Sequence, residues 1–139
     1  MHPTITRLTD AMNRHDAAGM ASLFRPDYRS DQPAHPNRGF GVAAQVQKNW
    51  SQMFAGVPDL RCESVADLDD GSTAWTEWRW TGTYTDGTPF ATAGVTIFRI
   101  ADDGRIASGH LYMEPVEQDG AAIDEAVRKL ARPGPRAET

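Results

Sequence analysis

Polar and ionisable side chains occupy alternate positions near the end of the chain. Ser108, His110, Tyr112 and Glu114 follow Ile106 at intervals of two residues, in a run that is typical of a β-strand. Side chains two residues apart point to the same face of a strand, so we expect these groups to lie together. A carboxylate beside an imidazole and a phenol can move a proton next to a carbonyl group, and burial would make Glu114 a better base near neutral pH.

This arrangement predicts Glu114 as a catalytic acid or base, with His110 and Tyr112 holding the substrate carbonyl. We expect Glu114 to face the interior of the protein. The alternative is an outward face, on which the three would be ordinary surface or dimer-interface residues, because the period of two does not say which face is inside.

Tryptophan dominates an earlier predicted strand. Trp78 and Trp80 fall on one face, and Trp75, Glu77 and Arg79 fall on the other. Either both faces pack against protein, or the first pair lines a ligand pocket. Aromatic side chains commonly line small-molecule cavities, and two more occur on the helix predicted before this strand: Trp50 and Phe54.

The segment from Tyr28 to Gly41 is polar and rich in proline and glycine, which predicts an ordered loop. Loops over a cavity mouth often carry functional side chains, so Tyr28, Asp31 and His35 are candidates for substrate contact. The alternative for His35 is a solvated loop histidine.

Apolar residues recur at helical spacing in three N-terminal segments. The first covers residues 5–12 and has Thr4 as its predicted N-cap. The second begins after Asp16 and extends to Phe24. The third covers residues 42–57.

The second half of the chain changes to a period of two. Asp-Gly pairs separate four predicted strands, near residues 60–69, 72–84, 89–100 and 105–115. Short connections require these strands to pair as an antiparallel meander, and glycines inside them predict that the sheet curls. Helices followed by strands indicate an α+β fold with the N-terminal helices packed on one face of the sheet.

We expect a single domain over residues 1–132 and a flexible tail over residues 133–139. Within the domain, a last amphipathic helix carries Ile123, Val127 and Leu130. We expect this helix to cover an open end of the sheet.

Charge and composition exclude several functions. The formal net charge of −5 disfavours binding to nucleic acid or to anionic membranes. Cys62 is the single cysteine, so no internal disulfide forms, and we expect a cytoplasmic protein without a metal site. The Gly-x-Gly-x-x-Ala pattern at residues 39–44 follows a proline-rich loop and not a strand, so we expect no nucleotide cofactor.

Several short stretches occur in an order that resembles a known family. They are Asp27-Tyr28 with Asp31-Gln32-Pro33, then Val57-Pro58-Asp59-Leu60, then Thr81-Gly82-Thr83-Tyr84, and finally Asp103-Gly104-Arg105-Ile106 leading to Glu114. From about residue 4 to residue 116 this order resembles the SnoaL-like polyketide cyclase branch of the nuclear transport factor two-like superfamily. The resemblance implies a cone-shaped roll with a deep apolar pocket, often a homodimer built on the outer sheet face, and Glu114 at the position of the acid/base carboxylate.

Two functions are compatible with these observations. The first is a cofactor-independent cyclase or isomerase that acts by proton transfer on an apolar, polyketide-like carbonyl substrate. The second is a ligand-binding or accessory domain without turnover. Large side chains on both faces of the sheet, such as Trp75, Val95 and Ile97, also predict a homodimer.

Overall fold

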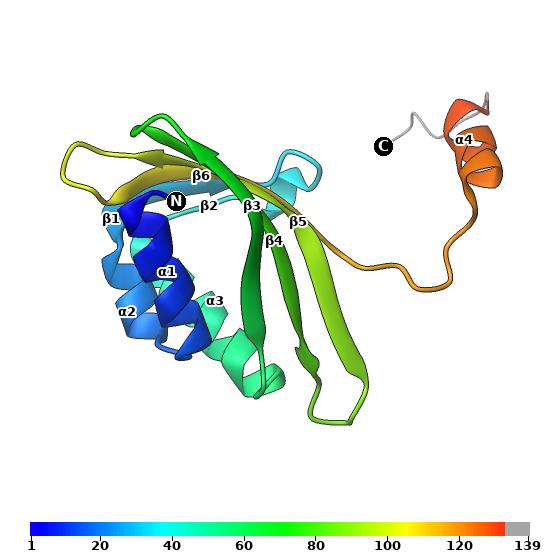
Figure 1. Cartoon of the computed structure of the whole chain (residues 1–139), viewed down its shortest axis with the longest axis horizontal. Helices are drawn as coiled ribbons and strands as arrows, with labels where there is room; N and C mark the ends of the chain where they lie inside the picture. Colours follow the sequence, from blue (N-terminus) through cyan, green and yellow to red (C-terminus); the bar gives the residue numbers. More distant parts are fainter. Residues whose placement is uncertain (133–139) are drawn as a thin grey trace.

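The structure is a computed structural model of the chain, and it describes residues 1–132. The predicted tail at residues 133–139 lies outside the described residues. Three helices pack against one face of a curved, unclosed six-stranded sheet, and a fourth helix stands apart from this body (Figure 1). None of the helices in the described part of the chain is long and apolar enough to cross a membrane.

Helix α1 spans Pro3–Asn13 and begins differently from the prediction. His2 is the N-cap, because its Nδ1 atom accepts a hydrogen bond from the backbone N–H of Thr4. The Thr4 hydroxyl instead donates to the carbonyl of Gly104, in the turn before the last strand. The predicted Thr4 cap is therefore wrong, and this residue ties α1 to the sheet.

Helix α2 spans Ala17–Ser22 and is capped by Asp16 as predicted. It ends earlier than expected, because strand β1 begins at Phe24 and runs to Asp31. Pro26 follows shortly and cannot continue a helix.

The predicted loop from Tyr28 to Gly41 is only partly a loop. It contains the second half of β1, a 3₁₀ turn η1 at Pro36–Arg38 and a short strand β2 at Phe40–Gly41. Strand β1 pairs in parallel with the last strand, about 80 residues away in the chain. Such a distant partner leaves no local signal in the sequence, and the alternation of exposed Arg29 with buried Tyr28 and Ser30 becomes visible only once the pairing is known.

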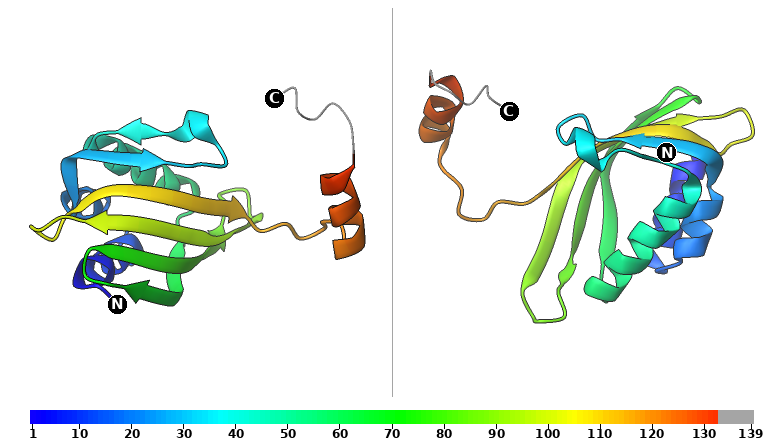
Figure 2. Two further views of the ribbon diagram at one scale, coloured as in Figure 1. Left: turned by 90° about the horizontal axis from the view of Figure 1, so that it is seen from above. Right: turned by 180° about the vertical axis from the view of Figure 1, so that it is seen from behind.

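The four predicted strands are confirmed as β3 Arg61–Asp69, β4 Thr73–Thr83, β5 Pro89–Ile100 and β6 Ile106–Pro115. The sheet order is β2-β1-β6-β5-β4-β3, and every pair is antiparallel except β1 with β6. Helix α3, Ala43–Gly56, lies with α1 and α2 on the concave face (Figure 2).

A bulge in β6 decides which side chains face the helices. Opposite β5, the register moves from Ile100 with Ile106 to Arg99 with Ser108, so Ala107 is an extra residue. Ile106 is buried on the concave side, whereas His110, Tyr112 and Glu114 point to the convex side. The prediction that these residues share a face with Ile106 is wrong, because one inserted residue reverses the alternation.

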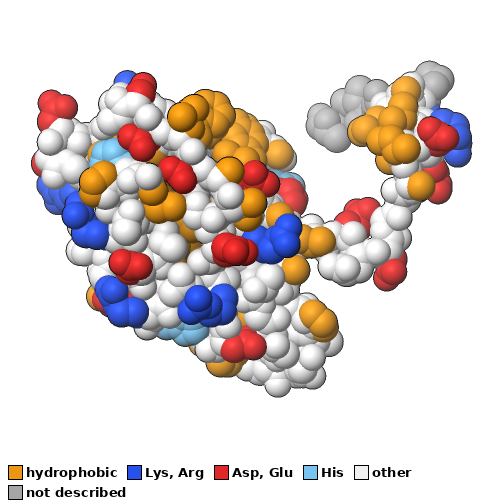
Figure 3. Space-filling view, in the orientation of Figure 1, with side chains coloured by type: hydrophobic (Ala, Val, Ile, Leu, Met, Phe, Trp, Pro, Cys, Tyr) orange, Lys and Arg blue, Asp and Glu red, His pale blue; other side chains and the backbone are white. Residues whose placement is uncertain are grey.

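Helix α4 spans Ile123–Ala131 and follows an extended segment, residues 116–122. Its apolar side chains are exposed to solvent, and 74% of Ile123 is accessible. The charged residues of the helix lie on its opposite side (Figure 3). The expectation that this helix covers an open end of the sheet is wrong for this structure, because the extended segment carries it away from the body (Figure 2).

Candidate functional site

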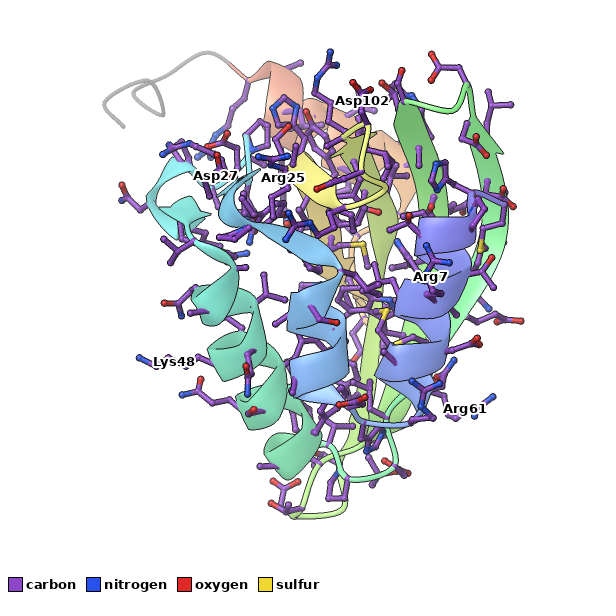
Figure 4. All side chains as sticks on the ribbon, turned by 90° about the vertical axis from the view of Figure 1, so that its left-hand side faces the viewer. Arg7, Arg25, Asp27, Lys48, Arg61 and Asp102 are labelled. Carbon is purple, nitrogen blue, oxygen red and sulfur yellow. The ribbon has the colours of Figure 1, made fainter. Side chains whose placement is uncertain are left out.

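A cavity of about 100 Å³ lies between the concave face of the sheet and helices α1, α2 and α3. Of the described residues that line it, seven are aromatic, five are aliphatic and four are polar but uncharged. Charged side chains such as Arg7 of α1 and Lys48 of α3 lie on the outside of the helical layer (Figure 4). The half-buried lining residues define the mouth: Gln32, Phe40, Asn49, Trp50 and Leu111.

Aromatic rings fix the shape of the cavity wall. The Trp50 and Trp80 rings meet edge to face with centroids 5.1 Å apart, and Trp78 packs beside Trp80 at 6.2 Å. Across the cavity, Tyr28 packs edge to face on Phe24 at 4.6 Å. Edge-to-face packing is a favourable arrangement of aromatic rings, and it stabilises these positions in the wall.

The polar groups of the wall differ in how they are satisfied. Trp78 Nε1 donates to Thr96 Oγ1 at 2.9 Å, within the buried part of the wall. At the mouth, Asn49 Oδ1 accepts from Gln45, and Gln32 Oε1 accepts from Arg38. These bonds hold the side chains of both amides in place beside the opening.

Three buried side-chain polar atoms have no hydrogen-bond partner among the described residues: Ser30 Oγ, Thr76 Oγ1 and Trp80 Nε1. Two of them, Ser30 and Trp80, belong to residues that line the cavity. A buried polar group without a partner costs about 1–3 kcal/mol, and such groups are rare in folded proteins. A molecule in the cavity that formed a hydrogen bond with one of these atoms would remove that cost.

Tyr28 carries the most acidic hydroxyl of the wall. Burial raises its pKa to about 12, with the neighbouring Ser30 hydroxyl offsetting part of the rise and the charge of Asp31 adding to it. Ser30 nevertheless lacks a hydrogen bond of acceptable geometry within residues 1–132. At neutral pH the Tyr28 hydroxyl therefore stays protonated and acts as a hydrogen-bond donor or acceptor, not as a base.

The structure places some of the predicted substrate-contacting residues in the wall and others outside it. Four of them line the cavity: Tyr28, Trp50, Trp78 and Trp80. Their role in ligand binding stays a prediction. Phe54 stacks on His15 with ring centroids 4.4 Å apart and is not part of the lining.

Asp31 and His35 also lie outside the lining. The Asp31 carboxylate faces Arg29 on the convex side, at 3.4 Å. His35 contacts the carboxylate of Glu114, with Nε2 2.8 Å from Oε2. The loop between β1 and β2, residues 32–39, therefore contributes Gln32 to the cavity and not His35.

The expectation that Glu114 faces the cavity is wrong. Its side chain is 53% exposed on the convex side, where His110 and Tyr112 are also exposed. The physical reason is the Ala107 bulge, which turns these three residues outward. A carboxylate on the far side of the sheet cannot reach a molecule in the cavity.

Several lining residues were missed by sequence reasoning. Thr96 lies directly opposite Thr76 in the β4–β5 pair, on the face that carries Trp78, so counting back from the Asp-Gly turn can find it. Ser30 and Phe40 lie in the segment that was interpreted as a loop, and no local signal identifies them. Within residues 1–132, no three His, Cys, Asp or Glu side chains lie together so as to hold a metal ion.

The sequence matches the SnoaL-like domain family over residues 5–109, more than half of the chain. The protein therefore belongs to the SnoaL-like domain family. No curated protein matches the sequence.

Solved structures share the fold at low sequence identity. A putative SnoaL-like polyketide cyclase from Jannaschia is 21% identical, with a TM-score of 0.67 over 80% of this chain and 83% of that chain. A hypothetical protein from Catenulispora acidiphila with a ketosteroid isomerase-like fold, in complex with trimethylamine, is 18% identical, with a TM-score of 0.69 over 79% of this chain and 84% of that chain.

A Mycobacterium tuberculosis protein in complex with estradiol-17β-hemisuccinate is 14% identical, with a TM-score of 0.67 over 78% of this chain and 89% of that chain. Similarity at these identities establishes the fold alone. The chain has the curved α+β roll of the nuclear transport factor two-like and ketosteroid isomerase-like proteins.

Proposed function

We propose that this protein binds a small, uncharged, largely apolar molecule in the cavity between the sheet and its helices. One observation carries the proposal: the lining contributed by the described residues is aromatic and aliphatic and contains no Asp, Glu, His, Lys or Arg. A charged ligand would lose its hydration there without gaining a partner of opposite charge, which is costly.

The size of the cavity limits the ligand. Sites for drug-sized molecules enclose roughly 300–1,000 Å³. The cavity here is about 100 Å³, so a ligand of about one ring fits without movement of the wall. A polyketide of several rings requires a wider cavity than this conformation provides.

Binding without turnover is favoured over proton transfer. A cyclase or isomerase of the expected kind needs an acid or base within hydrogen-bonding distance of its substrate. Glu114, His110 and Tyr112 lie across the sheet from the cavity, and Tyr28 keeps its proton at neutral pH. The geometry thus supports the ligand-binding function and offers no base for the catalytic one in the described wall.

Two of the structural neighbours are complexes with an organic molecule, which lends support. Trimethylamine and estradiol-17β-hemisuccinate are ligands of those proteins, on the same fold. We infer only that proteins of this fold can bind small organic molecules.

We also propose a homodimer through the convex face of the sheet. Trp75 is half exposed there, and its cross-strand neighbour Ile97 lies on the same face. Leu68 and Tyr112 extend the apolar surface, being 73% and 42% exposed. A second copy of the chain would cover this patch.

Calorimetric titration with methylenecyclohexane tests the proposed function. Burying seven carbon atoms at about 0.8 kcal/mol each predicts a Kd on the order of 0.1 mM. Asn49→Trp places an indole at the mouth and should abolish binding. The matched control is Gln52→Trp, at an exposed position on the same helix outside the lining, and it should bind like the parent.

Failure of the parent to bind the probe contradicts the proposal. Equal binding by the parent, Asn49→Trp and Gln52→Trp also contradicts it, because the probe would then be held elsewhere.

A further inference from the structure

We propose that the ligand of this cavity carries a hydrogen-bond acceptor, such as a carbonyl or ether oxygen, and that the indole N–H of Trp80 binds this acceptor. The inference rests on the proposed function and names the chemical class of the ligand. It also assigns Trp80 as the residue that selects for that class.

Two neighbouring tryptophans differ in whether the indole N–H has an acceptor. Trp78 and Trp80 lie on the same face of β4 and both line the cavity. Trp78 Nε1 has its acceptor in Thr96 Oγ1, at 2.9 Å. Trp80 Nε1 is buried, and the described chain supplies no acceptor for it.

The chemistry of the indole nitrogen limits what can satisfy Trp80. It is a donor only, so it can be satisfied by an acceptor and by nothing else. Trp80 is 9% exposed, which keeps its N–H away from bulk water. Because a buried donor without a partner is destabilising, this position is suited to an acceptor that arrives with the ligand.

Trp80 is placed where a ligand in the cavity can contact it. Trp80 lines the cavity, and its ring packs against Trp50, which is half-buried at the mouth. The second unpartnered group in the described wall is the Ser30 hydroxyl. A hydroxyl can donate or accept, and it therefore does not narrow the ligand class as the indole does.

The charge of the wall selects among acceptors. A carboxylate or phosphate would also accept from an indole, but the described lining offers no cation to balance it. An ammonium ion would favour the aromatic faces, yet it has no lone pair for the indole N–H. A neutral oxygen on an apolar molecule can accept the hydrogen bond of the Trp80 N–H, and it places no charge against the apolar wall.

Two probes of equal size test the inference. Cyclohexanone and methylenecyclohexane have the same ring and differ only in bearing an oxygen or a CH₂ group. Calorimetry would give the Kd of each probe for the parent, for Trp80→Phe and for Trp50→Phe. The ratio of the cyclohexanone Kd to the methylenecyclohexane Kd measures the effect of the oxygen acceptor alone, because a loss of ring volume in the wall affects both probes alike.

Trp80→Phe should raise the ratio of the cyclohexanone Kd to the methylenecyclohexane Kd by about 5- to 10-fold, the usual value of one neutral hydrogen bond. Trp50→Phe is the matched control: it makes the same substitution in the same wall and should leave the ratio unchanged. An unchanged ratio in Trp80→Phe overturns the inference while the proposed function stands. Binding of neither probe to the parent overturns both.

A second measurement needs no variant and so does not depend on the folding of Trp80→Phe. The infrared C=O stretch of bound cyclohexanone should lie at lower wavenumber than that of cyclohexanone dissolved in hexane, because a hydrogen bond weakens the C=O bond. A stretch equal to that in hexane would show a bound carbonyl without a donor, and would overturn the inference.

Discussion

The contact between His35 and Glu114 joins the loop before β2 to the end of β6 on the convex side. The Nε2 and Oε2 atoms are 2.8 Å apart, and the two side chains are 34% and 53% exposed. Pairs that are open to water contribute little, because both partners are well hydrated when separated.

Glu114→Gln should therefore lower the free energy of unfolding by less than about 1 kcal/mol. It should leave the Kd for methylenecyclohexane unchanged, because the side chain lies outside the cavity. Urea denaturation and calorimetry measure the two quantities. A tenfold loss of affinity would show that Glu114 acts on the cavity after all.

The ionisation of Tyr28, a residue of the cavity wall, contributes to the pH dependence of stability. Its pKa rises from 10.0 to about 12 on folding, chiefly through burial. Between these values the unfolded chain releases the phenolic proton while the folded chain retains it. Stability from this group is therefore fully present below pH 10 and is lost as the pH rises from 10 to 12.

Tyr28→Phe removes this ionisation, so the variant should lose less stability than the parent between pH 10 and pH 12. Thermal unfolding of both proteins from pH 8 upward measures the difference. Burial also raises the pKa of Cys62 to about 12, but this contribution is common to both proteins and cancels. Parallel stability curves above pH 10 would contradict the assignment.

At the scale of elements, Gly94 sets how closely β5 approaches β6. Its φ is 157°, and a Cβ placed there would meet the backbone carbonyl of Tyr112 at 1.9 Å. The obstacle is backbone and not a flexible side chain, so it cannot move aside. The predicted curl of the sheet thus depends at this point on the absence of a side chain.

Gly94→Ala should destabilise the protein by about 2–4 kcal/mol, because the strands must separate to admit the methyl group. Gly56→Ala is the control, since a Cβ at the end of α3 has no atom within 4 Å. That variant should be neutral or slightly more stable. Equal stability of the two variants, measured by urea denaturation, would contradict the described approach of β5 to β6.

Local sequence signals predicted those elements whose partners are near in the chain. The Asp-Gly turns fixed the limits of β3 to β6, and their glycines adopt positive φ, as at Gly71 and Gly87. Strand β1 was missed because its partner β6 is distant. The prediction of which β6 side chains face inward is wrong, because the bulge at Ala107 depends on the pairing of β6 with β5. No residue type in the sequence indicates this bulge.

The candidate site shows the same limit. Trp78 and Trp80 were correctly placed on one face of a strand, since period two alone determines that they share it. Whether that face is concave depends on where the helices pack. The unused donor of Trp80 was beyond sequence reasoning, because it depends on Thr96 lying within reach of Trp78 and not of its neighbour.

The convex sheet face carries an apolar surface that the helices packed on the sheet leave uncovered. It joins Trp75 of β4 to Tyr112 of β6 through Val95 and Ile97 of β5. A proposed homodimer would bury this surface while leaving the cavity mouth, on the other side of the sheet, open.

Sedimentation should therefore give a dimer at micromolar concentration, and Trp75→Lys should weaken it by at least about tenfold, because a charge would be buried in the interface. Gln52→Lys introduces the same charge on α3 and should leave the dimer intact. A clean monomer for the parent would contradict the proposed dimer. It would leave the proposal that a ligand binds in the cavity unaffected.

The four tryptophans can show by NMR whether the cavity is the binding site. Trp50, Trp78 and Trp80 line it, and Trp75 lies on the convex face. In a ¹⁵N–¹H spectrum each indole N–H gives one signal, which the corresponding Trp→Phe variant assigns. Titration with methylenecyclohexane should shift the signals of Trp50, Trp78 and Trp80 with a common Kd and leave that of Trp75 in place; a saturable shift of Trp75 alone, or no saturable shift in any of the four, would contradict the account.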